Sequence, residues 1–532
     1  MLPHALPPTP PALQVLLGAD LLGEDGATLP GQAVALRGGR IAAVGPAAQV
    51  LKRFPRARTV RLEGGTLLPG FIEGHAHVQA VGQQRDLADL AGLASLEGAL
   101  ARIRQWAGGR HGAWIQGRGW DQNLWAAKAF PTAAQLDRVT GPLPAAMERV
   151  DGHALWVNSA ALAAAGITRA TPDPPGGAIL RDAQGEATGI LLDGATDLVS
   201  KHIPAPTAEQ VRASLLDGLR TLRGLGFTAV ADMGIDQDAL DAYRVLAKAK
   251  ALPIRVFAYL AHDPALMARE LRHRRGRATA FFQVQGVKFY LDGALGSRGA
   301  RLLAPYADAP GQGLWVTDPA RVARDAQLTV TAGYQVAIHA IGDAANRQAL
   351  DLLGRIRPSL GGAPPRIEHA QIVTRADAAR FGPQGVVASV QPMHCVDDHA
   401  WTPERLGPAR LEEAFPWRAF LEHGAVLALG SDAPIADANP FAGLAAAETR
   451  QDAQGEPKGG FGPGDRLTRA EALRAYLGGN ARALGRKDLG ALKAGAVADL
   501  LWVQAPLTTL QVEQLRRLKP GRLWINGVEA AP

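Results

Sequence analysis

The chain of 532 residues contains a single cysteine, Cys395. One cysteine excludes an intramolecular disulfide and a zinc site built from several cysteines. The sequence also lacks any apolar stretch of about 20 uncharged residues, which excludes a membrane-spanning helix. The first residues are broken by prolines and do not resemble a signal peptide. These absences predict a cytoplasmic protein with no membrane partner.

Clustered positive charge is scarce as well. The net charge of +7 would suit a nucleic-acid-binding protein, but most arginines are scattered through helix-like segments that also carry Asp and Glu. We find no nucleic-acid-binding motif and no internal repeat, and therefore expect no nucleic-acid partner. Apolar residues make up 47% of the chain and charged residues 20%, which predicts a globular protein with a large core.

Eight short apolar runs that end in glycine or polar residues are the main pattern of the sequence. From the second onward, they recur at intervals of roughly 25–50 residues, which suits one strand followed by one helix. Alternating strands and helices predict an α/β fold with a parallel sheet, and eight units predict a closed (β/α)8 barrel, or TIM barrel. The expected strands are 67–77, 227–234, 253–260, 285–293, 334–343, 365–371, 385–394 and 425–434.

Two parts of the chain fall outside this pattern. About 150 residues separate the first expected strand from the second, far more than a simple connection requires. We expect residues 79–226 to form an insertion that covers the mouth of the barrel, and the barrel itself to comprise 67–78 and 227–484. Both ends of the chain are rich in strand-like segments, so 12–66 and 485–530 are expected to form one composite β-sandwich.

Ionisable residues lie at the C-terminal ends of several expected strands, where barrels of this class have their active sites. His75 and His77 form a His-x-His pair at the end of the first strand. Alternate residues of a strand point to the same face, so the two imidazoles would project together as a pair of metal ligands. A lone histidine is more often a hydrogen-bonded core residue, but the joint pattern predicts a metal site. The other candidates are Lys288, His339, His369 and Asp432.

The motifs that carry these residues resemble those of the amidohydrolase superfamily, and within it the family-three branch that includes N-substituted formamide deformylases. "PGFIEGHAH", "GVKFYLDGALGSRGA", "IHAIGD", "IEHAQ" and "GSDAP" resemble its motifs for strands one, four, five, six and eight. "VDGHALWVNSAAL" and "GGAILRDAQGEATG" resemble the insertion of that branch, and the resemblance spans roughly residues 12–528. One departure is "GNARALG", where the family often has an alanine-threonine-asparagine run.

This resemblance implies a binuclear centre, commonly with two zinc ions. A metal-bridging hydroxide would attack an amide carbonyl, and Asp432 would carry the proton to the leaving nitrogen. The first ion would be held by His75, His77 and Asp432, and the second by His339 and His369.

The resemblance also implies that Lys288 bridges the two ions after carbon dioxide has converted its amine to a carbamate. An ammonium group cannot bind a cation, whereas a carbamate presents two anionic oxygens. An apolar environment lowers the pKa of a lysine and leaves more of the reactive neutral amine. The alternative is an unmodified Lys288 neutralised by Asp292.

Several other residues are candidates for substrate contact. Four of them lie in the expected insertion, where the alternative role is folding of the insertion itself. One follows strand four and one ends strand seven. The six candidates are Trp120, Asp121, Asp151, His153, Arg298 and His394.

The sequence thus predicts a metal-dependent hydrolase that cleaves a carbon–nitrogen bond other than a peptide bond in a small amide. A deaminase, or a hydrolase of another acyl bond, is the first alternative, and Lys288 favours a binuclear centre over the mononuclear site usual in deaminases. The second alternative is a non-catalytic binding or regulatory protein, which the presence of all six candidate ligands disfavours. A homodimer remains open.

Overall fold

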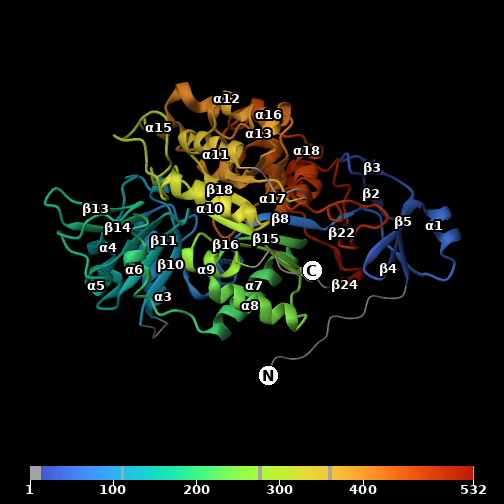
Figure 1. The fold of residues 1–532 in the computed structure, drawn as a ribbon, viewed down its shortest axis with the longest axis horizontal. Helices are drawn as coiled ribbons and strands as arrows, with labels where there is room; N and C mark the ends of the chain where they lie inside the picture. Colours follow the sequence, from blue (N-terminus) through green and yellow to red (C-terminus); the bar gives the residue numbers. More distant parts are fainter. Residues whose placement is uncertain (1–12, 109–112, 273–277, 357–361, 531–532) are drawn as a thin grey trace.

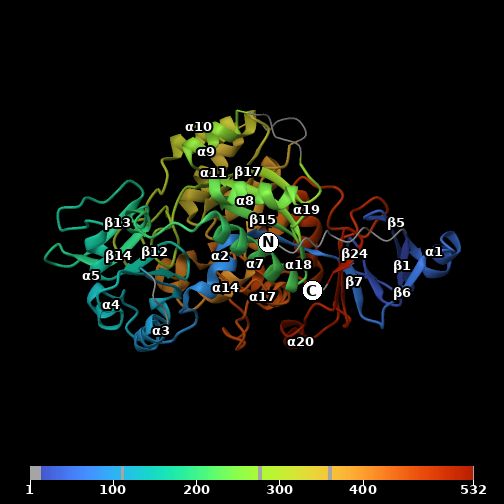
Figure 2. The ribbon, with the colours of Figure 1, turned by 90° about the horizontal axis from the view of Figure 1, so that it is seen from below.

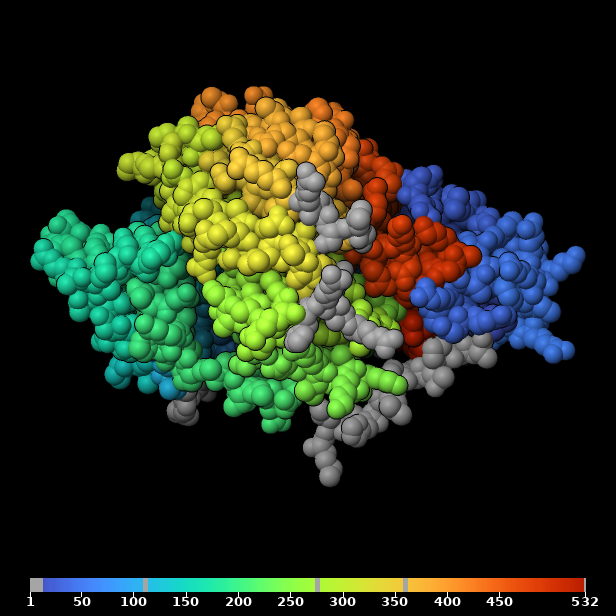
Figure 3. All heavy atoms as spheres, in the orientation of Figure 1, coloured from blue at the N-terminus to red at the C-terminus, as the bar shows by residue number. Residues whose placement is uncertain are grey.

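The structure is a computed structural model that describes residues 13–108, 113–272, 278–356 and 362–530. Three parts lie one after another along the longest axis of the molecule (Figure 1). A barrel occupies the middle, with a sheet formed by residues between 88 and 193 at one end and, at the other, sheets formed by segments near both ends of the sequence. Figure 3 shows the three parts in contact. None of the helices in the described ranges is long and apolar enough to cross a membrane.

Eight parallel strands form the central sheet in the order of the chain, which confirms the predicted (β/α)8 barrel. The first and last strands meet near their C-terminal ends, where the N–H of Asp432 donates to the carbonyl of His75 at 2.7 Å. Gly430 permits this approach, since a Cβ there would lie 2.6 Å from the backbone nitrogen of His75. The strands are β8 (Phe71–Ala76), β15 (Phe227–Ile235), β16 (Arg255–Ala261), β17 (Phe282–Tyr290), β18 (Gln335–Ala340), β19 (Arg366–His369), β20 (Val387–Val390) and β21 (Leu427–Leu429).

The strand expected at 67–77 is two strands in the structure. β7 (Thr66–Pro69) joins a sheet of the terminal part, and only β8 belongs to the barrel. Gly70 lies between them, against the side chain of Thr228, where a Cβ would come within 2.1 Å of that side chain. Every residue of both strands is buried, so the apolar pattern continues across the break, and the Pro69-Gly70 pair is the signal that marks it.

Helices cover the outside of the barrel (Figure 2). Residues of α7 such as Val211, Leu215 and Leu219 recur at helical spacing and pack into the same core as the barrel strands. α2 packs against α7 and shares this core, so the segment that leaves the barrel is the one between these two helices. The α-helices that precede, separate or follow the barrel strands, outside the inserted segment, are α2 (Val78–Gln83), α7 (Ala208–Gly224), α8 (Gln237–Lys248), α9 (Pro264–Glu270), α10 (Pro319–Thr331), α11 (Asp343–Arg355), α12 (Arg375–Ala378), α13 (Phe381–Gln384), α14 (Pro392–Asp398), α15 (Thr402–Leu406), α16 (Trp417–Glu422), α17 (Pro440–Thr449), α18 (Arg469–Arg474) and α19 (Asn480–Ala483).

The segment between α2 and α7 forms a six-stranded sheet of its own, in the order β13-β14-β12-β11-β10-β9. Its core contains Trp120, which packs against Trp125 and Trp156. The strands are β9 (Ala88–Asp89), β10 (Ile115–Trp120), β11 (Ala145–Arg149), β12 (Ala154–Val157), β13 (Gly177–Arg181) and β14 (Ala187–Asp193), and the helices are α3 (Leu96–Gly108), α4 (Ala133–Thr140), α5 (Ser159–Ala164) and α6 (Asp197–Ser200).

Two sheets lie at the opposite end of the molecule. The sheet β24-β23-β22-β7-β2-β3 combines strands from both ends of the chain, and the sheet β5-β4-β1-β6 is N-terminal. Leu16 and Leu36 of the second sheet share a core with Trp502 and Trp524 of the first. The remaining elements are β1 (Gln14–Leu17), β2 (Asp20–Leu22), β3 (Thr28–Leu29), β4 (Gln32–Arg37), β5 (Arg40–Pro46), α1 (Ala47–Arg53), β6 (Arg58–Arg61), β22 (Leu500–Val503), α20 (Val512–Arg516), β23 (Arg522–Ile525) and β24 (Val528–Ala530).

Candidate metal centre

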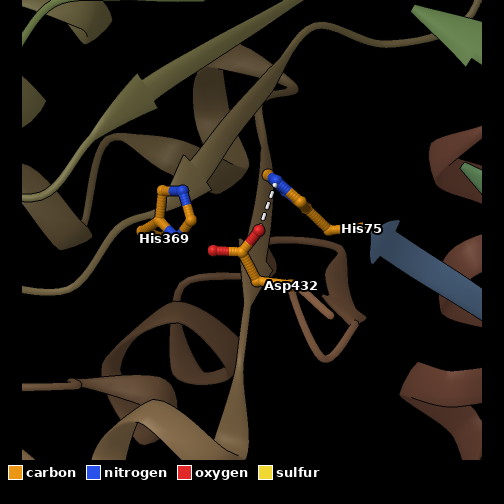
Figure 4. A group of neighbouring side chains, drawn as sticks. All are labelled: His75, His369 and Asp432. Atoms are coloured by element: carbon orange, nitrogen blue, oxygen red, sulfur yellow. Dashed lines mark ion pairs between the residues drawn. The ribbon is translucent and has the colours of Figure 1, made fainter. Parts of the chain in front are cut away.

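Three of the predicted ligands meet at the C-terminal ends of the barrel strands. His75 comes from β8, His369 from β19, and Asp432 follows β21. One potential ligand atom from each residue lies within 4.8 Å of the others, and all three residues are buried. Figure 4 shows the carboxylate between the two imidazoles. Strands far apart in the sequence thus bring nitrogen and oxygen donors to one place.

The carboxylate of Asp432 is the centre of this group. Its Oδ1 atom lies 3.3 Å from Nε2 of His75 and 3.1 Å from Nε2 of His77, yet this buried oxygen receives no hydrogen bond with acceptable geometry from the described residues. Burial by itself would raise the pKa of Asp432, but His75, His77 and His369 hold it well below its usual value. An ionised, buried oxygen without a donor, facing imidazole nitrogens, fits a divalent cation bound among them.

Three of the histidines are oriented in the same way. In each ring, Nδ1 lies within hydrogen-bond distance of an oxygen acceptor, so that the Nε2 lone pair is available to a metal, as is usual for ligating histidines. The acceptors are Oε2 of Glu368 for His75 (2.7 Å), the carbonyl of Met233 for His77 (2.9 Å) and Oε1 of Gln391 for His369 (2.9 Å).

The ring of His339 packs against the ring of His369, and their centroids are 4.6 Å apart. Its Nε2 atom is 3.4 Å from the carbonyl of Gly293, so this ring presents Nδ1 rather than Nε2 as the free nitrogen. Burial and the neighbouring positive groups hold the pKa values of His339 and His369 well below the usual value for histidine. Neutral imidazoles are the form that binds a metal.

Lys288 of β17 is buried beside these ligands. Its Nζ atom lies 3.2 Å from Nε2 of His75. Burial lowers the pKa of Lys288 to about 8, although the charges of Glu368 and Asp432 oppose this shift. Asp292 does not neutralise it: the Asp292 carboxylate accepts hydrogen bonds from the backbone N–H groups of 301, 341 and 342 instead.

Two of the predicted substrate contacts lie beside the ligands. The ring of His153, from the segment between α2 and α7, has its centroid 5.0 Å from that of His339. The imidazole of His394, on α14, stacks on His369, and its Nε2 atom lies 3.7 Å from Oδ2 of Asp432. Both the insertion and the loop after β20 therefore reach the predicted metal ligands.

His153 is held in place by Asp193 at the end of β14. The Nδ1 atom of His153 lies 2.6 Å from Oδ1 of Asp193. Burial lowers the pKa of His153, but the hydrogen bond and charge of Asp193, with a contribution from Asp151, outweigh burial and raise the pKa to about 9. No pattern in the sequence points to Asp193, because its pairing with His153 depends on the pairing of β12 with β14.

The other four substrate candidates have partners outside the predicted metal ligands, although Asp151 also accepts a hydrogen bond from the backbone N–H of His153 at 3.0 Å. The side chain of Trp120 has no exposed surface, and its Nε1 donates to the carbonyl of Met147 at 2.7 Å. Trp120 therefore belongs to the core of the insertion. Folding of the insertion is the alternative role stated for it above. The remaining three have ionic partners: Asp121 and Asp151 both pair with the buried Arg149, and Arg298 pairs with Asp308 at 2.9 Å.

Two glutamates beside the ligands were not selected from the sequence. Glu73 accepts hydrogen bonds from the N–H of His75 at 3.0 Å and from the N–H and hydroxyl of Ser431, each at 2.9 Å. It thereby joins β8 to the loop that carries Asp432, and burial raises its pKa to about 7. Glu368 bonds His75. Both residues are carboxylates within strands that are buried, and a buried ionisable group requires a partner. Their position in such strands was the signal in the sequence that could have identified them.

The backbone at two of the ligands is strained. His369 has φ +72° and Asp432 has φ +59°, the left-handed region that few residues other than glycine adopt. Conformations of this kind concentrate at functional sites, where the surrounding structure holds them. Here they turn the ligand side chains toward one another at the ends of β19 and β21.

Comparison with known protein families agrees with this geometry. The model described as "Amidohydrolase family" matches residues 58–531, and a model described as "Imidazolonepropionase-like composite domain, bacteria" matches residues 33–57. The chain therefore belongs to the amidohydrolase family, as its motifs predicted.

Three relatives align over most of their length. Protein LONG AFTER FAR-RED 3 from Arabidopsis thaliana is 34% identical over 93% of this chain and 88% of that protein. The putative amidohydrolase YtcJ from Bacillus subtilis (strain 168) is 30% identical over 93% and 95%. The N-substituted formamide deformylase from Arthrobacter pascens is 28% identical over 97% of each chain.

Solved structures share the architecture. An uncharacterized metal-dependent hydrolase from Pyrococcus horikoshii OT3 has a TM-score of 0.77 at 26% identity, over 94% of this chain and 99% of that chain. A mutant of atrazine chlorohydrolase from Arthrobacter aurescens TC1 has a TM-score of 0.52 at 16% identity, over 97% and 94%, which shows the same fold.

Proposed function

We propose that this protein is a hydrolase that uses two divalent metal ions to cleave the amide C–N bond of a small molecule, such as an N-substituted formamide. The observation that carries the proposal is the convergence of buried donors at one end of the barrel, with an unbonded Asp432 oxygen at its centre. The similarity to N-substituted formamide deformylase over nearly the whole chain supports the substrate class. The donors of the proposed centre are His75, His77, Lys288, His339, His369 and Asp432.

Zinc is the metal we propose. Imidazole nitrogens with a carboxylate oxygen form a donor set that zinc favours, whereas calcium and magnesium prefer oxygen alone. The atrazine chlorohydrolase of the same fold is described in complex with zinc.

The proposed chemistry divides between the metals and the chain. Bound divalent ions supply Lewis acidity and lower the pKa of a coordinated water toward neutrality. Asp432 accepts the proton from the attacking water and transfers it to the leaving nitrogen, so that the amine departs neutral. The Oδ1 atom of Asp432 faces the histidines, which leaves Oδ2, on the side of His394, to carry the proton.

Lys288 would bridge the metals as a carbamate. The neutral amine attacks the carbon of carbon dioxide, an N–C bond forms, and the nitrogen loses a proton to solvent. Burial supports this step, because it lowers the pKa of Lys288 to about 8 and so raises the neutral fraction at neutral pH.

His153 and His394 are the groups that we propose to contact the substrate. They lie beside His339 and His369, on the side of the insertion and of α14. With Asp193 at its Nδ1 atom, His153 offers its other ring nitrogen for a hydrogen bond to substrate. Trp120, Trp125 and Trp156 are buried in the core of the insertion, so we assign this wall of the site to polar groups.

The decisive experiment is a substrate panel on zinc-reconstituted protein, with N-substituted formamides, longer amides, esters and amino-heterocycles. We expect amine release from amides, and none after the metals have been removed with a chelator. Hydrolysis confined to esters or deamination of heterocycles would replace the amide assignment. No turnover by protein that holds two zinc ions would contradict the proposal.

A further inference from the structure

The interior of this barrel contains charged groups close to the proposed metal centre. Such interiors are usually filled by branched apolar side chains. Here Arg366 and Glu368 of β19 lie two residues apart, so both point to the same face of the strand. Both side chains are completely buried. A buried ion pair contributes little net stability, because apolar side chains of similar volume often stabilise a protein as much or more.

Arg366 is held by four strands. Its guanidinium donates to the carbonyl of Gly74 on β8 at 2.7 Å, to the Tyr259 hydroxyl on β16 at 3.3 Å and to the Ser389 hydroxyl on β20 at 2.8 Å. It also binds both carboxylate oxygens of Glu368, at 2.8 and 3.1 Å. A guanidinium fixed from several directions presents a carboxylate in one orientation.

In this orientation, Glu368 contacts His75, one of the proposed metal ligands. Its Oε2 atom lies 2.7 Å from Nδ1 of His75. An ionised carboxylate can only accept a hydrogen bond, so Nδ1 of His75 must carry the proton and Nε2 must carry the lone pair. The Nε2 atom is the one that faces Asp432.

We propose that Arg366 and Glu368 form a positioning unit that fixes the tautomer and the ring orientation of His75 for metal binding. This inference rests on the metal-dependent function proposed above. It assigns the unit to metal affinity rather than to stability of the barrel.

The chain contains a matched control for a purely structural role. Arg255 and Asp499 also form a buried two-point pair, with N–O distances of 2.6 and 3.1 Å. Asp499 accepts a further hydrogen bond from the backbone N–H of Asn526 at 2.7 Å, so its second contact is with the terminal sheet instead of a predicted ligand. Removal of either carboxylate leaves a buried arginine without its ionic partner. Only the removal of the Glu368 carboxylate also removes a hydrogen-bond partner of His75.

The test compares Glu368→Gln with Asp499→Asn in zinc-reconstituted protein, by competition with a chromogenic chelator. The amide of Gln can turn its NH2 group toward Nδ1 of His75 and reverse the tautomer. We expect one zinc per chain to bind about 10–100-fold more weakly in Glu368→Gln, as for other partners of ligating histidines, and both zinc ions to bind within about twofold of wild type in Asp499→Asn.

A second variant covers the case in which Glu368→Gln does not fold. Glu368→Asp keeps the charge beside Arg366 but withdraws the oxygen from His75, so we expect the same loss of affinity and an altered absorption spectrum of the cobalt-substituted protein. Wild-type affinity for both metals in the folded variants would overturn the inference, and so would equal losses in the control. Wild-type protein that binds two zinc ions but cleaves no amide would remove the substrate assignment and leave this inference standing, whereas failure of wild type to bind zinc would overturn both.

Discussion

His153 and His339 belong to different layers of the molecule, yet their ring centroids lie 5.0 Å apart. His339 is on barrel strand β18, and His153 precedes β12 in the sheet inserted between α2 and α7. Asp193, also from that sheet, holds the ring of His153 in place. The insertion therefore supplies part of the immediate surroundings of a predicted metal ligand.

His153→Gln is expected to retain both metals and to lower kcat/KM for amides by about 10–100-fold, since a hydrogen bond to a charged group contributes about 1.5–3 kcal/mol. The measurement is steady-state kinetics across an amide series, with zinc content as the check on the centre. His262→Gln is the matched control, because His262 is also paired with an aspartate, Asp325, at 2.7 Å. Unchanged kinetics for every amide would exclude His153 from substrate binding.

Trp120→Ala is expected to destabilise the protein without changing its ranking of substrates. The ring is buried against Trp125 and Trp156, and truncation of a buried tryptophan costs about 3–5 kcal/mol. A lower midpoint of urea unfolding, with an unchanged order of kcat/KM values in the amide series, is the expected result. A changed order at an unchanged midpoint would return Trp120 to the substrate site.

The barrel and the convergence of His75, His369 and Asp432 could be predicted because their signals are local in sequence. His75, His77 and Asp432 each lie at or just after the end of an apolar strand, and strand ends of a parallel barrel share one face. The partners of these ligands could not be predicted in the same way. Asp193 and Gln391 contact histidines through the packing of separate strands, and no spacing along the chain contains that information.

Trp120 was predicted to contact the substrate, whereas the structure places its side chain in the core of the insertion. A segment that folds as a six-stranded sheet needs a core of its own. Trp120 and Trp156 are fully buried in that core. Composition alone cannot distinguish the core of an insertion from the lining of a pocket, because both are apolar.

Asp432→Asn is expected to preserve the fold and to reduce turnover at least about a hundredfold, since it removes the proton carrier. The backbone at this position has φ +59°, which Asn tolerates as readily as Asp, and the Asn oxygen remains available as a ligand. Circular dichroism and zinc content serve as controls beside the kinetics, with Asp325→Asn as the matched carboxylate. Turnover within about threefold of wild type would exclude Asp432 as the proton carrier.

Carboxylation of Lys288 predicts that recovery of the metal centre depends on carbon dioxide and on pH. Only the neutral amine reacts, and with a pKa of about 8 the neutral fraction is roughly a tenth at pH 7 and approaches one well above pH 8. For metal-free protein given zinc at a fixed concentration of dissolved carbon dioxide, the rate of recovered activity should therefore rise with pH through about 8 and level off only well above it. Lys288→Ala should bind zinc weakly and recover part of its affinity with acetate, whose two oxygens can replace the carbamate. Recovery that needs no carbon dioxide, at a rate independent of pH, would show that Lys288 acts as an unmodified amine.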